Sequence, residues 1–353
     1  MAYISFQPRD FFNTLLYTGG SGFTAFTGVG FQPDMTWHKD RTSGVNWWGQ
    51  CDSVRGVNTG GKDCAAVYSN DPSAQGIDTT SYLNGYQSDG FTAGNNGSFG
   101  SEGYTYASWC WKAGTAHSGA TTGSGTPKTY TASVNTTSGF SITEYGGNGT
   151  TGHTIPHNLG VVPEFIIVKD LASNAWQVYN KNITKDYILV LNTTAAQANE
   201  TNRWNAEPTS TVFELGDSAT VNGSGNTYIS YAFAPIKGYS KFGIYEGNTN
   251  LDGPFIHTGF RPSTVMFKNI DRVEAWKIYD TKRSPFNVTE SSLIIDDTAA
   301  ENTSTAIKID ILSNGFKIRT DSYNWNGDGE TYVYMAFAEA PFVNSNGVPC
   351  NAR

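Results

Sequence analysis

The chain is poor in charge. Charged side chains make up 15% of its 353 residues, against roughly 25% in ordinary soluble domains, and the formal net charge is −8. Lysine and arginine form no cluster, so a nucleic-acid partner is not expected. No run approaches the roughly 18 apolar residues of a membrane span. Residues 1–8 lack a basic stretch followed by an apolar one, so neither membrane insertion nor a secretory signal is expected.

Cysteine and the common catalytic motifs are also scarce. Four cysteines without a Cys-x-x-Cys make neither a disulfide scaffold nor a structural zinc site. Cys51 and Cys64 have a spacing that allows pairing, and the sequence leaves this open. Cys110 occupies a column that holds Ala232 and Ala336 further along, which predicts a small core residue. No Gly-x-Ser-x-Gly, phosphate loop or His-Glu-x-x-His occurs, so the sequence predicts no enzyme activity and no cofactor.

The chain does contain one pattern three times. Each copy begins with Tyr-x-Gly, at Tyr17, Tyr145 and Tyr245, and continues through Gly-x-x-Pro, Lys-[Asp/Asn] and tryptophan to a closing aromatic strand. The recurring lysines and tryptophans are Lys39, Lys169, Lys268, Trp48, Trp176 and Trp276. So many ordered matches predict three related domains of about 100 residues, each long enough for one β-sandwich.

The closing segments show the two-residue period of strands. In the first copy Ala107, Trp109 and Trp111 alternate with smaller or hydroxylated residues, which places the bulky set on one face, toward a core. Asn222-Gly223 and Asn326-Gly327, just before two closing strands, are hairpin signals. Helical signals are limited to single turns at 194–200 and 298–301. The predicted fold class is all-β: three tandem related β-sandwich domains, jelly-roll or lectin-like, with an N-terminal docking arm.

Composition predicts the divisions of the chain. Phenylalanine and leucine make the N-terminal arm too apolar to stay free, so it is expected to dock on a partner or a neighbouring domain. A stretch rich in Gly, Ser and Thr has the composition of a linker. The predicted parts are an arm at 1–16, sandwiches at 17–112, 138–238 and 239–343, a linker at 113–137, and a polar tail at 344–353.

Several stretches carry a resemblance to a known family. They are residues 28–39, residues 106–114 with Trp109-Cys110-Trp111-Lys112, and residues 314–320 followed by 332–342. These resemble a repeated β domain of marine bacteriophage virion proteins, especially those of viruses that infect cyanobacteria. The resemblance implies a lectin-like sandwich in a tail fibre or other virion appendage, and no catalytic motif. Residues 231–235 of the second copy keep the strand but lose the Trp-x-Trp-Lys form.

Residues that recur in every copy are better explained by packing than by binding. The tryptophans are therefore expected in the core, and the lysines at strand ends with their stems over apolar surface. Residues present in one copy are better site candidates. Trp204 and Trp325 qualify, and with the amides of Asn324 and Asn326 they are candidates for binding a glycan, the rings covering sugar C–H faces. The alternative is that these rings pack on a neighbouring subunit.

Two further groups are weighed against simpler explanations. Asn324, Asn326, Asp328 and Glu330 alternate oxygens as calcium loops do, but the series lacks the usual acids, so a plain turn is favoured and no metal is expected. Paired carboxylates for glycoside cleavage would have to come from residues such as Asp296, which lie beside recurring columns and have a structural explanation.

The sequence therefore favours a structural appendage protein of a tailed phage virion, a tail fibre or surface fibre that attaches to the host. A decoration or knob without a receptor is the alternative, and a glycan-degrading spike is a third. Expected partners are other virion proteins through the arm, a host surface glycan, and further copies of the chain, with a trimer as first guess. The expected location is the virion, assembled in the bacterial host cytoplasm.

Overall fold

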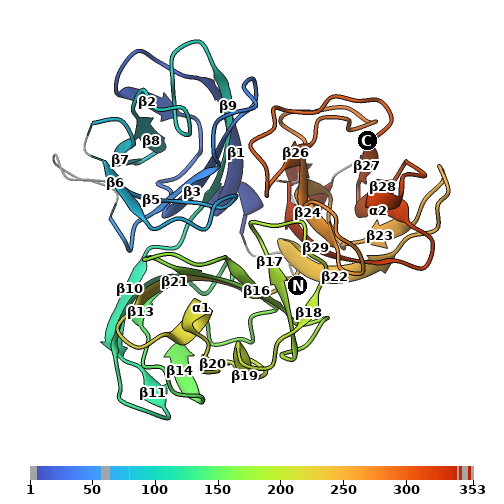
Figure 1. Cartoon of the computed structure of the whole chain (residues 1–353). Coiled ribbons are helices and arrows are strands. Elements are labelled where there is room, and N and C mark those ends of the chain that lie inside the picture. Colours follow the sequence, from blue (N-terminus) through green and yellow to red (C-terminus); the bar gives the residue numbers. More distant parts are fainter. Residues whose placement is uncertain (1–5, 57–63, 79, 340–341, 344–348, 351–353) are drawn as a thin grey trace.

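Three lobes lie around a common centre (Figure 1). We define lobe 1 as residues 6–112, lobe 2 as 113–239 and lobe 3 as 240–339. Regular structure is nearly all β-strand, and none of the described helices is long and apolar enough to cross a membrane. The structure is a computed structural model, and it describes residues 6–56, 64–78, 80–339, 342–343 and 349–350.

Lobe 1 is a sandwich of two antiparallel sheets, with strand orders β1-β9-β3-β4-β5-β6 and β2-β8-β7. Its elements are η1 (Pro8–Asp10), β1 (Phe12–Thr18), β2 (Thr24–Thr27), β3 (Met35–Asp40), β4 (Gly49–Asp52), β5 (Cys64–Tyr68), β6 (Gly76–Asp78), β7 (Leu83–Gln87), β8 (Gly90–Ala93) and β9 (Thr105–Trp111).

Lobe 2 pairs the sheet β10-β12-β13-β21-β15-β16-β17-β18 with the sheet β11-β14-β20-β19. Its elements are β10 (Thr115–Ala120), β11 (Thr122–Gly123), β12 (Thr129–Asn135), β13 (Phe140–Gly146), β14 (His153–Pro156), β15 (Phe165–Asp170), β16 (Gln177–Asn180), β17 (Tyr187–Val190), β18 (Ala198–Asn199), β19 (Trp204–Ala206), β20 (Val212–Leu215), α1 (Ala219–Asn222) and β21 (Thr227–Phe233).

Lobe 3 pairs the sheet β22-β29-β24-β25-β26 with the sheet β23-β28-β27, and a two-stranded ribbon β30-β31 follows it. The elements are β22 (Ser240–Glu246), β23 (Phe255–His257), β24 (Pro262–Asn269), β25 (Lys277–Asp280), β26 (Leu293–Ile294), β27 (Ile309–Leu312), β28 (Gly315–Ile318), α2 (Tyr323–Asn326), β29 (Thr331–Ala338), β30 (Phe342–Val343) and β31 (Pro349–Cys350).

The larger sheets share one strand order. In each, the strand that carries the Tyr-x-Gly tyrosine pairs with the closing strand, which pairs in turn with the strand after Gly-x-x-Pro. The tyrosine stacks on the tyrosine that stands opposite it in the closing strand, and offset aromatic pairs of this kind stabilise a sheet face. The pairs and ring-centroid distances are Tyr17–Tyr106 at 5.1 Å, Tyr145–Tyr228 at 5.3 Å and Tyr245–Tyr332 at 4.6 Å.

The closing strand of each larger sheet is buried on both faces. In β9, Tyr106 and Cys110 face the core of lobe 1, whereas Ala107, Trp109 and Trp111 face a core to which all three lobes contribute. The bulky set of the closing strand therefore packs between lobes. Because period two alone does not say which face meets which core, the sequence predicted the alternation but not this shared core. Cys110 is buried, as its column predicted.

One aromatic residue from each closing strand meets at the centre of the shared core. The ring centroids of Trp111, Phe233 and Phe337 are 5.6 to 6.2 Å apart. The N-terminal segment covers this cluster, since Phe12 stacks on Phe337 at 4.7 Å and Phe6 packs on Tyr239 at 5.5 Å.

Two predicted divisions of the chain are wrong. Residues 12–16, assigned to a docking arm, belong to β1 in the first sheet. The arm's phenylalanines do pack on neighbouring lobes, Phe12 on Phe337 and Phe6 on Tyr239, as one of the two expected alternatives had it. Residues 113–137, assigned to a linker, form strands of the second lobe; β12 is paired along its length with β13. Threonine suits strands as well as linkers because it is β-branched, so composition misled here. Residues 1–5 of the arm lie outside the described residues.

The turn chemistry also differs from expectation. Asn222-Gly223 and Asn326-Gly327 end the one-turn helices α1 and α2 rather than form hairpins, and neither glycine has positive φ. The stretches 194–200 and 298–301, predicted as helical turns, are not helical. In the tail, Pro349–Cys350 forms a short strand, and residues 344–348 and 351–353 lie outside the described part of the chain.

Candidate functional site

The two predicted glycan-binding tryptophans are buried. Trp204 is 1% exposed and packs edge-on against Tyr179 and Phe213 in the core of lobe 2. Trp325 is 4% exposed and donates its indole N–H to the Tyr279 hydroxyl at 2.8 Å. Neither ring offers a face to a sugar, so we do not propose them as a binding site. Each fills the interior of its own lobe.

The amides beside Trp325 have structural roles as well. Asn326 is fully buried, donates to the backbone carbonyls of Asn250 and Thr320, and accepts from the amide of Asn248. The backbone carbonyl of Asn324 accepts from Lys277. Asn222 makes the same set of contacts in lobe 2. An asparagine with this role is therefore present in both lobes, although the tryptophan that precedes Asn326 is not.

The calcium-like series is dispersed in the structure. Asn326 is committed to the backbone, while Glu330 accepts from Asn269 at 2.7 Å and forms an ion pair with Arg272. Asp328 lies in an exposed turn beside Gly247. Among the residues that the structure describes, no group of three or more His, Cys, Asp or Glu could hold a metal ion.

The recurring tryptophans join neighbouring lobes. All three are fully buried in the shared core, as expected of recurring residues, but each donates its indole N–H to a carbonyl of another lobe. Trp48 of lobe 1 bonds Ile294 and Asp297 of lobe 3, at 2.8 and 3.1 Å. Trp176 of lobe 2 donates to the carbonyls of Tyr68 and Asp71 in lobe 1. Trp276 of lobe 3 donates to the carbonyl of Val190 in lobe 2. The three contacts form a closed ring of head-to-tail junctions.

Two of the three recurring lysines donate across these junctions, whereas Lys268 Nζ donates within its own lobe, to Asn269 and Arg272. All three lysines are buried, not extended over apolar surface as predicted. Lys39 Nζ donates across the junction to Thr298 at 2.7 Å, and Lys169 Nζ donates to Pro72 at 3.1 Å. Burial lowers the pKa of Lys39, Lys169 and Lys268 to about 8, while nearby carboxylates oppose the shift at each lysine. The carbonyl bonds explain why an ammonium group is tolerated there.

Backbone bonds complete each junction. The amides of Gln75, Gln197 and Glu301 donate to the carbonyls of Leu171, Ile270 and Arg41, at 2.8 to 3.0 Å. At the junction of lobes 1 and 3, which no peptide segment connects directly, Arg41 also makes a two-point ion pair with Glu301, at 2.7 and 3.0 Å. The ring therefore closes at this junction through a backbone hydrogen bond and this ion pair, without a peptide connection.

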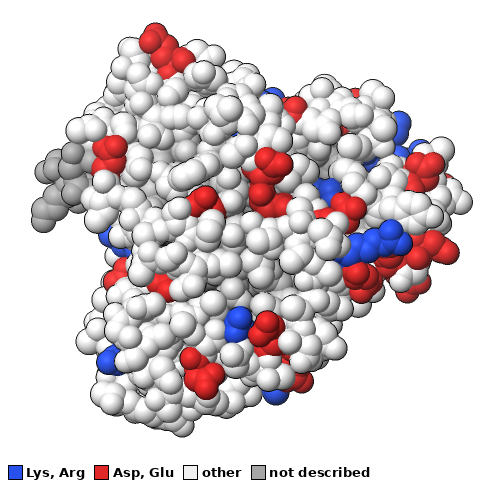
Figure 2. Space-filling model, in the orientation of Figure 1, with Lys and Arg blue, Asp and Glu red and all other residues white. Residues whose placement is uncertain are grey.

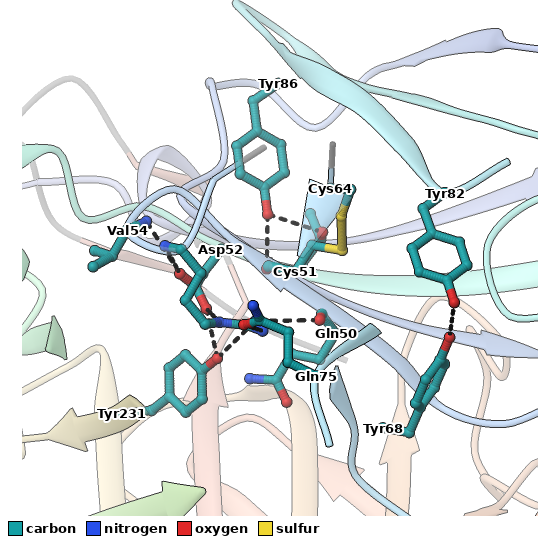
Figure 3. Close-up of a disulfide and its surroundings, with 12 residues drawn as sticks. Gln50, Cys51, Asp52, Val54, Cys64, Tyr68, Gln75, Tyr82, Tyr86 and Tyr231 are labelled. Atoms are coloured by element: carbon teal, nitrogen blue, oxygen red, sulfur yellow. Dashed lines mark hydrogen bonds and ion pairs between the residues drawn. A yellow bond between two sulfur atoms is a disulfide. The ribbon is translucent and has the colours of Figure 1, made fainter. Parts of the chain in front are cut away.

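A buried ion pair stands in two of the three junctions. Arg55 bonds Asp52 at 2.6 Å with both side chains fully buried, and Asp52 also accepts from Tyr231 of lobe 2 at 2.7 Å (Figure 3). Asp280 and Arg283 form the same pair against Trp109 of lobe 1. In lobe 2 the matching positions are neutral, Asn180 and Ile183. The junctions share one geometry but differ in charge.

A further recurring column holds the turn before each tryptophan strand. Asn70, Asn192 and Asp296 each accept from the amide of a recurring tryptophan, at 2.7 to 2.9 Å. Burial raises the pKa of Asp296 to about 6, although Lys277 and Lys268 lie close enough to oppose the shift. The third copy thus carries a carboxylate where the other two carry an amide.

Asp296→Asn is expected to stabilise the protein at pH 7. A carboxyl whose folded pKa lies above its unfolded value of 3.8 favours the folded state only when protonated, so wild-type stability falls as pH rises from about 4 to 6. The amide removes that loss, a gain of about 1–3 kcal/mol at pH 7 that vanishes near pH 4. Urea unfolding at both pH values measures it; a variant less stable than wild type at pH 7 contradicts the assignment.

Cys51 and Cys64 form a disulfide between β4 and β5 of lobe 1 (Figure 3). The sequence left this pairing open. The bridge joins the two ends of a loop whose residues 57–63 lie outside the described part of the chain, and both sulfur-bearing residues belong to the lobe 1 core. Disulfides of this kind persist in oxidising surroundings.

A groove runs along the junction of lobes 1 and 3. Its volume is about 550 Å³, and its lining mixes cations with anions, among them Arg9, Asp10, Lys282 and Glu339. Because its lining contains both cations and anions, the groove does not present a surface of a single charge. It marks the place where the ring closes without a covalent connection.

A shallower pocket of about 260 Å³ lies on lobe 1, beside the same junction. Trp47 lines it with 39% of its surface exposed, and its ring meets Tyr68 edge-on at 4.9 Å. Two hydrogen bonds hold the loop that carries Trp47. Asn46 donates to Asp40 at 2.6 Å, and the Asn46 carbonyl accepts from Lys39 at 2.9 Å. The other lining residues are Val45, Asn96, Gly97 and Ser98.

Sequence reasoning passed over Trp47 because it stands next to a recurring tryptophan. The criterion of occurrence in one copy would have found it: the residues before Trp176 and Trp276 are Ala175 and Ala275. The same criterion selected Trp204 and Trp325, which are buried, so occurrence in one copy identifies a site only together with exposure.

Comparison with known proteins closes the description of these surfaces. No curated protein and no solved structure matches the chain. The family described as Domain of unknown function (DUF7483) matches residues 7–341, across all three lobes, and the chain belongs to that family.

Proposed function

We propose that the protein is a non-enzymatic virion appendage of a tailed phage, a tail fibre or surface fibre that presents lectin-like β-sandwiches for attachment to a host surface. The three lobes are, in this proposal, related tandem domains that have become one rigid body. The closed ring of junctions is the observation that best supports this proposal, because the recurring polar and aromatic residues hold the lobes together.

The ring favours a protein that presents surfaces. Trp48, Trp176 and Trp276 are buried in the core shared by the lobes, and the recurring lysines are buried as well, so they are not free to act on a substrate. One chain by itself places three lobes around a common centre. Association of further copies, and contact with other virion proteins, remain part of the proposal and need a surface other than the phenylalanines of the N-terminal segment.

Two features suit a location outside the cell. The Cys51–Cys64 disulfide is typical of proteins that work in oxidising surroundings. The surface carries few charges, and Figure 2 shows them scattered over a mostly uncharged face. An uncharged surface rich in amide and hydroxyl groups suits contact with neutral polymers more than with nucleic acid.

Labelling of whole particles tests this function. Antibody fragments raised against the purified protein are expected to decorate particles released from cells that carry the gene, at a repeated position seen by negative-stain microscopy. Purified protein is also expected to compete with those particles for adsorption to host cells. Labelled particles without competition would favour decoration without a receptor, and unlabelled particles would exclude a virion component.

A further inference from the structure

We propose that the pocket of Trp47 and Tyr68 on lobe 1 binds a neutral sugar ring. The inference rests on the proposed attachment function and gives it a ligand class and a site. The ring of Trp47 forms an apolar wall next to Tyr68, and amide and hydroxyl side chains form the remainder of the lining. A sugar presents the matching surfaces, an apolar C–H face and hydroxyl edges.

Trp47 differs from every other tryptophan of the chain. All nine tryptophans lie within the described residues, and the other eight are at most 4% exposed, against 39% for Trp47. Packing does not require the ring, because lobes 2 and 3 build the same strand entry with Ala175 and Ala275. An exposed large aromatic that the fold does not need is best explained by binding.

The pocket keeps polar atoms available. Within the described part of the chain, the indole N–H of Trp47, the amide oxygen of Asn46 and the hydroxyl of Ser98 have no hydrogen-bond partner. Trp47 is 39% exposed, and the side-chain oxygens of Asn46 and Ser98 are not fully buried, so water or a ligand can reach this pocket. These atoms supply one donor, one acceptor and one group that can do either.

The lining also explains why the sugar should be neutral. It contains no charged residue, and the nearest lysine, Lys39, directs its ammonium group to the carbonyls of Asn46 and Thr298. Asp40, beneath Asn46, contributes negative charge nearby. A uronic acid or sialic acid would therefore meet no cation and some repulsion.

Hydrogen bonds within lobe 1 hold the side chains of the pocket in place. Asn46 is fixed by Asp40 and Lys39, and the Tyr68 hydroxyl donates to Tyr82 at 2.7 Å (Figure 3). A Cβ placed on Gly97 would collide with the amide of Asn46, so this glycine allows the two loops to meet. Preorganised side chains lose little conformational freedom on binding, which favours a weak but specific site.

The test combines a glycan array with fluorescence quenching. The array carries oligosaccharides of neutral hexoses, of N-acetylhexosamines and of uronic or sialic acids. Wild-type protein is expected to bind at least one uncharged oligosaccharide, and that oligosaccharide is expected to protect Trp47, the accessible fluorophore, from acrylamide. Binding only to the acidic oligosaccharides, or binding without protection, would overturn the proposal.

Three variants sharpen the test. Trp47→Ala, which copies the residue of lobes 2 and 3, is expected to fold normally and to lose binding by about tenfold or more. Trp47→Phe keeps an aromatic face and is expected to retain most of it. Tyr323→Ala removes another exposed ring, 54% exposed on lobe 3, and serves as the matched control. Equal binding by Trp47→Ala and wild type would contradict the site.

The outcomes separate this site from the attachment function. If particles are labelled and purified protein competes for adsorption, but Trp47→Ala competes as well as wild type, the pocket is wrong and attachment stands. If Trp47→Ala loses both glycan binding and competition, both are supported. If wild type binds no array oligosaccharide but still competes for adsorption, the neutral-sugar assignment fails and attachment does not.

Discussion

Trp48→Ala is expected to lower the free energy of unfolding of the whole chain by about 3–5 kcal/mol, the usual cost of truncating a large buried aromatic. The indole fills the shared core, stacks on Trp109 at 5.4 Å and bonds two carbonyls of lobe 3. Its loss opens a cavity at the one junction that no peptide segment spans directly. Urea unfolding followed by far-ultraviolet circular dichroism measures the change.

The neighbouring residue supplies the control. Trp47→Ala removes the same side chain one position earlier, and because that ring is partly exposed at a position held by alanine elsewhere, its effect is expected within about 0.5 kcal/mol. Trp48→Phe should fall between the two, since it keeps an aromatic ring and loses the indole hydrogen bonds. Equal effects of the two alanine variants would contradict the placement of Trp48 between lobes.

Asp52→Asn is expected to cost about 3–5 kcal/mol, because it leaves the charge of Arg55 buried without its counter-ion. The asparagine can still accept from the amides of Val54 and Arg55, so the loss reports the charge and not the turn. The amide NH2 then replaces Oδ2, which in the wild type accepts from Arg55 Nε and from the Tyr231 hydroxyl of lobe 2, so both donors lose that acceptor. Thermal and urea unfolding at pH 7 give the magnitude.

The matched rescue is the double variant Asp52→Asn with Arg55→Ile, the pair that lobe 2 carries as Asn180 and Ile183. Replacing a buried ion pair by neutral groups of suitable shape is often nearly neutral, so the double variant should recover most of the stability lost by the single one. If the double variant is no more stable than Asp52→Asn, the ion pair stabilises the junction by more than the mutual neutralisation of its two charges.

The sequence predicted the repeated features well where each copy needs the same local contacts. The Tyr-x-Gly tyrosines, the alternation of the closing strands and the burial of Trp48, Trp176 and Trp276 follow from period and recurrence, and all-β sandwiches follow from them. The partner of each tryptophan could not be predicted, because the indole N–H reaches a carbonyl of another lobe and a local pattern carries no information on that contact.

The site predictions failed for a related reason. Trp204 and Trp325 stand near residues rich in asparagine or glycine in sequence, as in a sugar-binding loop, but in space they point into the lobe cores. Trp47 is adjacent to a core tryptophan in sequence and faces solvent, because successive residues of an extended chain point to opposite sides. The arm and the linker were misassigned because phenylalanine, threonine and serine suit several environments, and pairing decided between them.

Because the three sandwiches share one core, we expect them to unfold together. Differential scanning calorimetry of the wild-type chain with its disulfide intact measures this cooperativity. We expect a single transition whose calorimetric and van't Hoff enthalpies agree, and which moves as a whole in Trp48→Ala. Three separable transitions, with only one displaced by that substitution, would show independent lobes and contradict this expectation.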